Sequence, residues 1–175
     1  MVIELGMPLD DAQTSRLQQM LERLKDEHSA LKKELVHFQE ITSELVGILG
    51  SEESKRLLQE IRKQMETFML QLEAHEHWEE DEVLPILAGY ANQGMEPTFW
   101  TSTWVLGEDH KQAERFVRSF LEFADQCKSA DSIRLKKAIS LLRVACSVLS
   151  EHLLSEEEMF FPVANQMLND IYAKA

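Results

Sequence analysis

Two stretches of the chain share one spelling: AHEHWEEDEVLP at residues 74–85 and EHLLSEEEMFFP at residues 151–162. Both read His-x-x-x-Glu-Glu, followed after two residues by an apolar pair and a proline. Each histidine falls where an amphipathic helix would carry an apolar residue. Side chains four residues apart lie above one another on a helix, so His75 with Glu79, and His152 with Glu156, can each reach one point in a helical core.

Around these motifs, apolar residues recur at steps of three and four, which is the pattern of helices with one buried face. Scarce glycine and proline divide the chain into four such stretches. The expected helices cover about 17–45, 51–88 and 98–126, with a fourth that starts after Asp131 as a plausible N-cap. Long helices joined by short connections predict an all-α fold, an up-down-up-down four-helix bundle. Pro85 and Pro162 are expected to end or kink their helices in the preceding turn.

Every expected helix carries a histidine on its apolar stripe, and two of the helices also carry a glutamate there. A helix with one histidine followed by a helix with His-x-x-x-Glu occurs twice, so a bundle with pseudo-twofold symmetry would bring both sets to its axis. The residues on the stripes are His28, His75, Glu79, His110, His152 and Glu156. Two other histidines, His37 and His77, fall off the stripes and are expected at the surface or beside the ligands rather than among them.

Four imidazoles and two carboxylates in one core would be costly to bury without compensation. One histidine on an apolar stripe is more often a satisfied core residue than a ligand. Six such groups in four helices favour a pair of metal ions, because imidazole suits iron, zinc, copper and nickel and carboxylates can bridge two cations. The predicted metal ligands are His28, His75, Glu79, His110, His152 and Glu156.

Composition limits the class of protein and its partners. The 175 residues suit one domain, 1–175, with a core at about 21–164. The net charge of -13, from 31 acidic and 18 basic residues, disfavours nucleic acid and anionic membrane surfaces as partners. We expect no transmembrane helix and, in the absence of a secretion signal, a cytoplasmic location. Cys127 and Cys146 are expected to be buried packing residues.

The double motif, with the Glu-His of LKDEHSAL at residues 24–31 and the Asp-His of LGEDHKQA at residues 106–113, resembles the hemerythrin-like, or HHE cation-binding, family. The resemblance runs from roughly Leu21 to Ala164. It implies a bundle with a non-haem di-iron centre. In that centre, the first two helices would supply His28 and His75 to one iron, the last two would supply His110 and His152 to the other, and Glu79 and Glu156 would bridge them.

The resemblance has one departure. Oxygen-carrying hemerythrins are expected to have a fifth histidine one turn from His110, where this chain has Leu106 and Glu114. That difference weighs against oxygen carriage. Glu114 is either an oxygen donor or a surface partner of Arg115 or Arg118, and the helix register favours the surface. The other acidic residues of the motifs are expected to be solvated: Glu80, Asp81, Glu157 and Glu158.

Three functions remain open on the sequence. The first is a di-iron protein that binds or senses oxygen, nitric oxide, peroxide or iron itself. The second is an enzyme, a di-iron oxidase or peroxidase or an iron-repair protein, that uses the same centre. The third and least favoured is a metal-free helical interaction module. Other divalent metals are alternatives to iron, and no catalytic residue outside the metal ligands is predicted.

Overall fold

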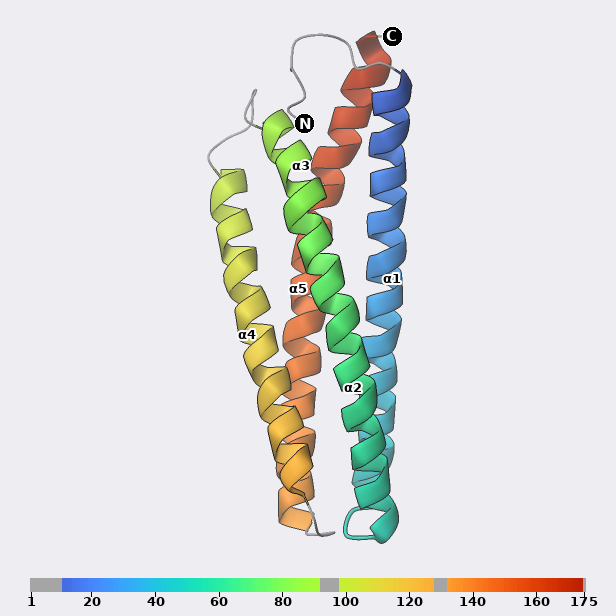
Figure 1. Ribbon diagram of the computed structural model, residues 1–175, viewed down its shortest axis with the longest axis vertical. Helices are drawn as coiled ribbons and strands as arrows, with labels where there is room; N and C mark the ends of the chain where they lie inside the picture. Colours follow the sequence, from blue (N-terminus) through green and yellow to red (C-terminus); the bar gives the residue numbers. More distant parts are fainter. Residues whose placement is uncertain (1–10, 92–97, 128–131, 175) are drawn as a thin grey trace.

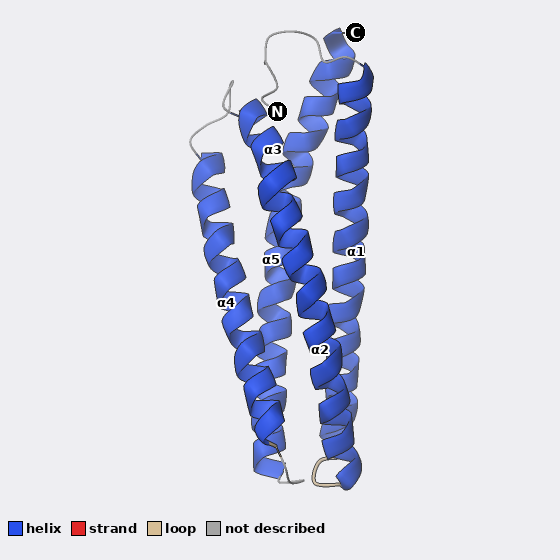
Figure 2. Cartoon of the chain, in the orientation of Figure 1, coloured by secondary structure: helices blue, strands red, loops and turns tan. Residues whose placement is uncertain are grey.

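The computed structural model describes residues 11–91, 98–127 and 132–174, and over those residues it is helical with no strand (Figure 2). The helices are α1 (Asp11–Gly47), α2 (Glu52–Trp78), the π-helix η1 (Glu79–Val83), α3 (Leu84–Ala91), α4 (Thr98–Gln126) and α5 (Ser132–Lys174). Because α2, η1 and α3 follow one another without a break, the described residues form four long rods. The predicted all-α fold is confirmed.

The rods pack as a four-helix bundle. α1 lies against α2 and α5, and α4 lies against the same two helices from the other side. Successive rods run in opposite directions, so that the start of α1 and the end of α5 lie at the same end of the molecule (Figure 1). This is the predicted up-down-up-down arrangement, which brings one face of every rod to a common core.

A tight turn reverses the chain between α1 and α2. Gly50 has a φ of 87°, a left-handed conformation that costs glycine little and commonly follows the end of a helix. Ser51 then caps α2, since its hydroxyl oxygen accepts a 3.1 Å hydrogen bond from the backbone N–H of Ser54. These two residues explain why a short connection suffices to set α1 and α2 antiparallel.

The second rod widens just before Pro85. The backbone N–H of Leu84 donates to the carbonyl of Glu79, five residues earlier, and this defines the π turn. Proline has no N–H to donate, and in a regular α-helix its ring would clash with the carbonyl four residues before it. The wider turn relieves this conflict. The predicted distortion before Pro85 is therefore present, and it begins at Glu79, one of the predicted ligands.

Pro162 has a different outcome, because α5 continues through it to Lys174. Of the two outcomes expected at this proline, an end or a kink, the helix end does not occur. Beyond the proline, Val163, Ala164 and Met167 are buried in an apolar cluster with residues of α1 and of the second rod. Their burial favours continuation of the helix over the loss of one backbone hydrogen bond.

Two apolar clusters fill the bundle. One contains Phe38, Phe68, Phe120 and Leu149, and the other contains Leu24, Val83 and Phe160. On each of three rods the predicted ligands lie where the segments that supply the two clusters meet: His28 on α1, His75 and Glu79 on the second rod, and His152 and Glu156 on α5. A buried polar layer therefore separates two apolar regions.

The buried face of α5 is broader than its predicted stripe. Leu141 and Val148 stand at helical spacing before His152 but are only partly buried, whereas Leu142 and Leu149 are fully buried. The reason is that α5 packs against both α1 and α4. Two contacting neighbours bury a wider arc of the helix than a single line of residues.

α5 is also long and apolar enough, over Ser132–Ala173, to cross a membrane by length and composition alone. The expectation that the chain has no transmembrane helix stays a prediction. Burial covers 44% of the most apolar 18-residue window, so much of this apolar character belongs to the core of the bundle. A core helix passes the same test, which makes length and composition weak grounds for a membrane span.

Candidate metal centre

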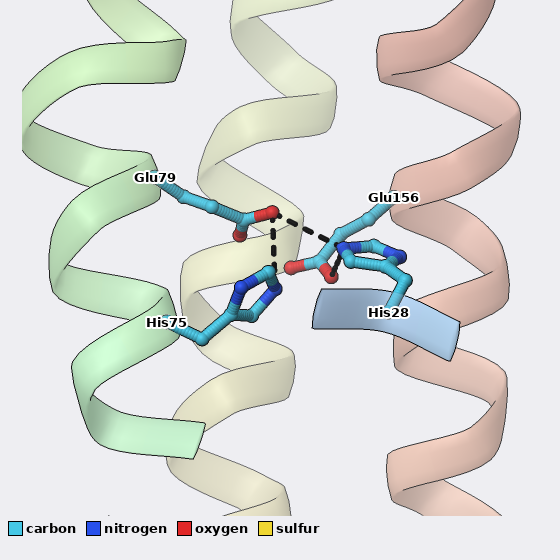
Figure 3. A group of neighbouring side chains, drawn as sticks. All are labelled: His28, His75, Glu79 and Glu156. Atoms are coloured by element: carbon cyan, nitrogen blue, oxygen red, sulfur yellow. Dashed lines mark hydrogen bonds and ion pairs between the residues drawn. The ribbon is translucent and has the colours of Figure 1, made fainter. Parts of the chain in front are cut away.

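Four side chains from three rods converge in the polar layer (Figure 3). His28 comes from α1, His75 and Glu79 from the second rod, and Glu156 from α5. One potential ligand atom from each residue lies within 4.8 Å of the other three. All four side chains are buried. The packing of the bundle therefore brings both His-x-x-x-Glu motifs to one place.

His28 lies between the two motifs. Its Nε2 atom is 3.3 Å from Oε1 of Glu79 and 3.6 Å from Oε2 of Glu156. Each glutamate also lies beside the histidine of its own motif: His75 Nε2 is 3.3 Å from Glu79 Oε1, and His152 Nε2 is 2.7 Å from Glu156 Oε1. Five of the six predicted ligands are thus neighbours in the core.

This donor set has the chemistry of a cation site. It offers imidazole nitrogen and carboxylate oxygen, the ligands that suit iron and zinc. Nε2 of His75 is buried and forms no hydrogen bond of good geometry, although Oε1 of Glu79 is 3.3 Å away. A buried nitrogen that faces carboxylates without a hydrogen bond is costly as it stands. The same atom is well placed to bind a metal ion, so the residues fit such a group.

The electrostatic surroundings lead to the same conclusion. Burial alone would lower the pKa of His75, but the carboxylate of Glu79, with those of Glu27 and Glu156, raises it to about 9. Without a metal, the proton on His75 places positive charge between the carboxylates. A bound cation would supply that charge instead, so proton and metal compete for this residue.

Two carboxylates beside the centre were missed by the sequence analysis. Oε2 of Glu27 lies 2.7 Å from Nδ1 of His75. Oε1 of Glu157 lies 3.4 Å from Nδ1 of His28 and 2.5 Å from Nζ of Lys32. The expectation that Glu157 is solvated is wrong, since its side chain is only 18% exposed. The packing of α5 on α1 places it against the His28 ring.

The other acidic residues of the motifs, Glu80, Asp81 and Glu158, are exposed as predicted. One signal could have pointed to Glu27. It directly precedes His28, and it stands four residues after Arg23, a spacing that allows the two side chains to pair on the face of α1 next to the histidine.

The remaining sequence predictions fall in two groups. His110 lies in α4, but its side chain is outside the described part of the structure. Glu114 is 39% exposed and accepts a 2.9 Å hydrogen bond from Nε of Arg118, so its predicted surface position is confirmed. The two histidines that fall off the stripes are both exposed, as expected. His37 lies on the surface of α1, and Nδ1 of His77 lies 2.7 Å from the carbonyl oxygen of Glu73.

An antiparallel four-helix bundle with imidazoles and carboxylates converging in its interior belongs to the class of bundles that hold metal ions between facing helices. The chain matches the model of the hemerythrin HHE cation binding domain over residues 19–164. It is therefore a member of that family, and the resemblance seen in the sequence is confirmed. Comparisons with curated proteins and with solved structures gave no match.

Proposed function

We propose that this protein is a non-haem di-iron protein that binds or senses a small ligand such as oxygen, nitric oxide or peroxide. His28 and His75 would hold one iron, His110 and His152 the other, and Glu79 and Glu156 would lie between them. The observation that carries the proposal is the approach of two buried carboxylates from different helices to one imidazole, that of His28. Two cations would balance this negative charge.

The chain's own residues supply the environment of the centre. When bound, the iron ions would provide a redox-active pair with positions for a small ligand. Glu79 and Glu156 contribute two negative charges that favour cations over neutral guests. The apolar clusters on either side of the polar layer exclude bulk water, which strengthens electrostatic interactions at the centre. Glu114 lies on the surface, away from this donor set.

The proposal is tested by metal analysis and optical spectroscopy of the purified protein after anaerobic loading with ferrous iron. We expect two iron ions per chain and a spectrum that changes reversibly when oxygen, nitric oxide or peroxide is added. Rapid and continued consumption of peroxide would instead support the oxidase or peroxidase alternative. A colourless protein that retains no iron after loading would contradict the proposal and favour a metal-free helical module.

A further inference from the structure

The two ring nitrogens of His75 face carboxylates from different helices. Nε2 points toward the centre, 3.3 Å from Oε1 of Glu79. Nδ1 lies on the other side of the ring, 2.7 Å from Oε2 of Glu27, which belongs to α1. This second contact has the length of a strong hydrogen bond. His75 is therefore held from outside the centre by a neighbouring helix.

Glu27 is itself anchored by residues of both helices. Nε of Arg23 donates a 2.7 Å hydrogen bond to its Oε1 atom, which leaves Oε2 for His75. The guanidinium carbon of Arg23 lies 3.9 Å from the centre of the Trp78 ring, an arrangement in which cation and aromatic ring attract. Trp78 is on the same helix as His75, so the four residues form a closed connection between α1 and α2.

The charge on Glu27 suits an acceptor of hydrogen bonds. Its Oε1 atom accepts from the guanidinium of Arg23 and its Oε2 atom faces Nδ1 of His75, so both oxygens meet donors. Glu27 is thus a carboxylate at neutral pH. The comparable contact on His28 is looser, because Oε1 of Glu157 lies 3.4 Å from Nδ1 and makes no hydrogen bond there.

We propose that Glu27 is a positioning residue for His75: it accepts the Nδ1–H hydrogen bond, fixes the orientation of the ring and directs the Nε2 lone pair toward a metal ion. A neutral imidazole has one N–H and one lone pair, so an acceptor at Nδ1 determines which nitrogen is free to bind. A carboxylate acceptor also makes the ligating nitrogen more basic. This inference rests on the proposed metal site.

The test uses cobalt(II) as the probe, because its visible absorption reports the ligand field. Cobalt affinity is measured by competition with a chelator for the wild type, Glu27→Leu, Glu27→Gln and a control, Glu34→Leu, on the exposed face of the same helix. We expect Glu27→Leu to lower the affinity about 10- to 100-fold and to shift the cobalt spectrum. Glu27→Gln should have an affinity and a cobalt spectrum between those of Glu27→Leu and the wild type, since an amide oxygen still accepts from Nδ1–H. Glu34→Leu should match the wild type.

Two results would overturn the inference. The first is a Glu27→Leu variant with the affinity and spectrum of the wild type. The second is an equal loss in both Glu27 variants that follows a loss of metal-free stability, measured by circular dichroism in chelator, because Glu27 would then be structural. Failure of the proposed function looks different: the wild type itself would bind no cobalt, and both proposals would fall together.

Discussion

His28 Nε2 lies 3.3 Å from Oε1 of Glu79, although the two residues are 51 positions apart in the chain. The same nitrogen is 3.6 Å from Glu156, which belongs to the other His-x-x-x-Glu motif. His28 is not followed by a His-x-x-x-Glu glutamate of its own, yet it lies beside the glutamates of both motifs. The meeting of three helices at one imidazole places the centre in the middle of the polar layer.

Replacing His75 should remove metal. His75→Ala deletes an imidazole at the centre and leaves Glu79 without the partner of its own motif, so we expect the loss of at least one iron per chain in metal analysis after anaerobic loading. His77→Ala is the matched control two residues away, because His77 is exposed and should leave the iron content unchanged. Equal iron contents in the two variants would contradict the assignment of His75.

Chelation should lower thermal stability. A metal that binds the folded chain and not the unfolded chain adds RT ln(1 + [L]/Kd) to the free energy of unfolding, or about 2.7 kcal/mol at a hundredfold excess over Kd. We expect the melting temperature, followed by circular dichroism, to fall when iron is removed and to recover when it is restored. A melting temperature that does not respond to iron would argue for the metal-free module.

The metal-free protein should lose stability as pH rises from about 6.5 to about 9. The pKa of His75 is about 9 in the folded state, above the ordinary value of 6.5 for a histidine. A pKa raised by folding contributes stability that is complete below the unfolded value and is lost as pH passes through the folded value. In chelator, the free energy of unfolding of the wild type should therefore approach that of His75→Gln as pH rises. A gap between the two proteins that widens toward pH 9 would be the opposite of this expectation.

Glu114→His should leave the centre unchanged. The side chain pairs with Arg118 on the surface, so its replacement removes an exposed ion pair that contributes about 0–1 kcal/mol and adds no ligand. We expect the spectrum and the autoxidation rate of the iron-loaded protein to match those of the wild type. A large change in either would place residue 114 at the metal.

The Cys146 thiol should be inert in the folded protein. Burial raises the pKa of Cys146 to about 12, so almost no reactive thiolate exists at neutral pH. Cys127 is also buried. Ellman's reagent should therefore label neither thiol under native conditions and both in denaturant. Rapid native labelling would show that this part of the core opens readily.

The sequence determined the helices and most of the centre. Apolar periodicity is a local property, so it located the second rod, α4 and the start of α5 closely. It also placed His28, His75, Glu79, His152 and Glu156 on buried faces. The repeated motif then identified the family, because its spacing sets imidazole and carboxylate one turn apart on a single helix. Each of these inferences needed only patterns within single helices, read without knowing how the helices pack.

Tertiary structure decided which acidic residues accompany the ligands. Glu27 and Glu157 resemble many other glutamates on charged helix faces, and they differ only because a histidine of another helix lies beside each of them. Neither contact follows from helical periodicity, since it depends on how α1 is rotated and packed against α2 and α5. Packing between helices also explains why α5 continues past Pro162, although proline by itself favours the end of a helix.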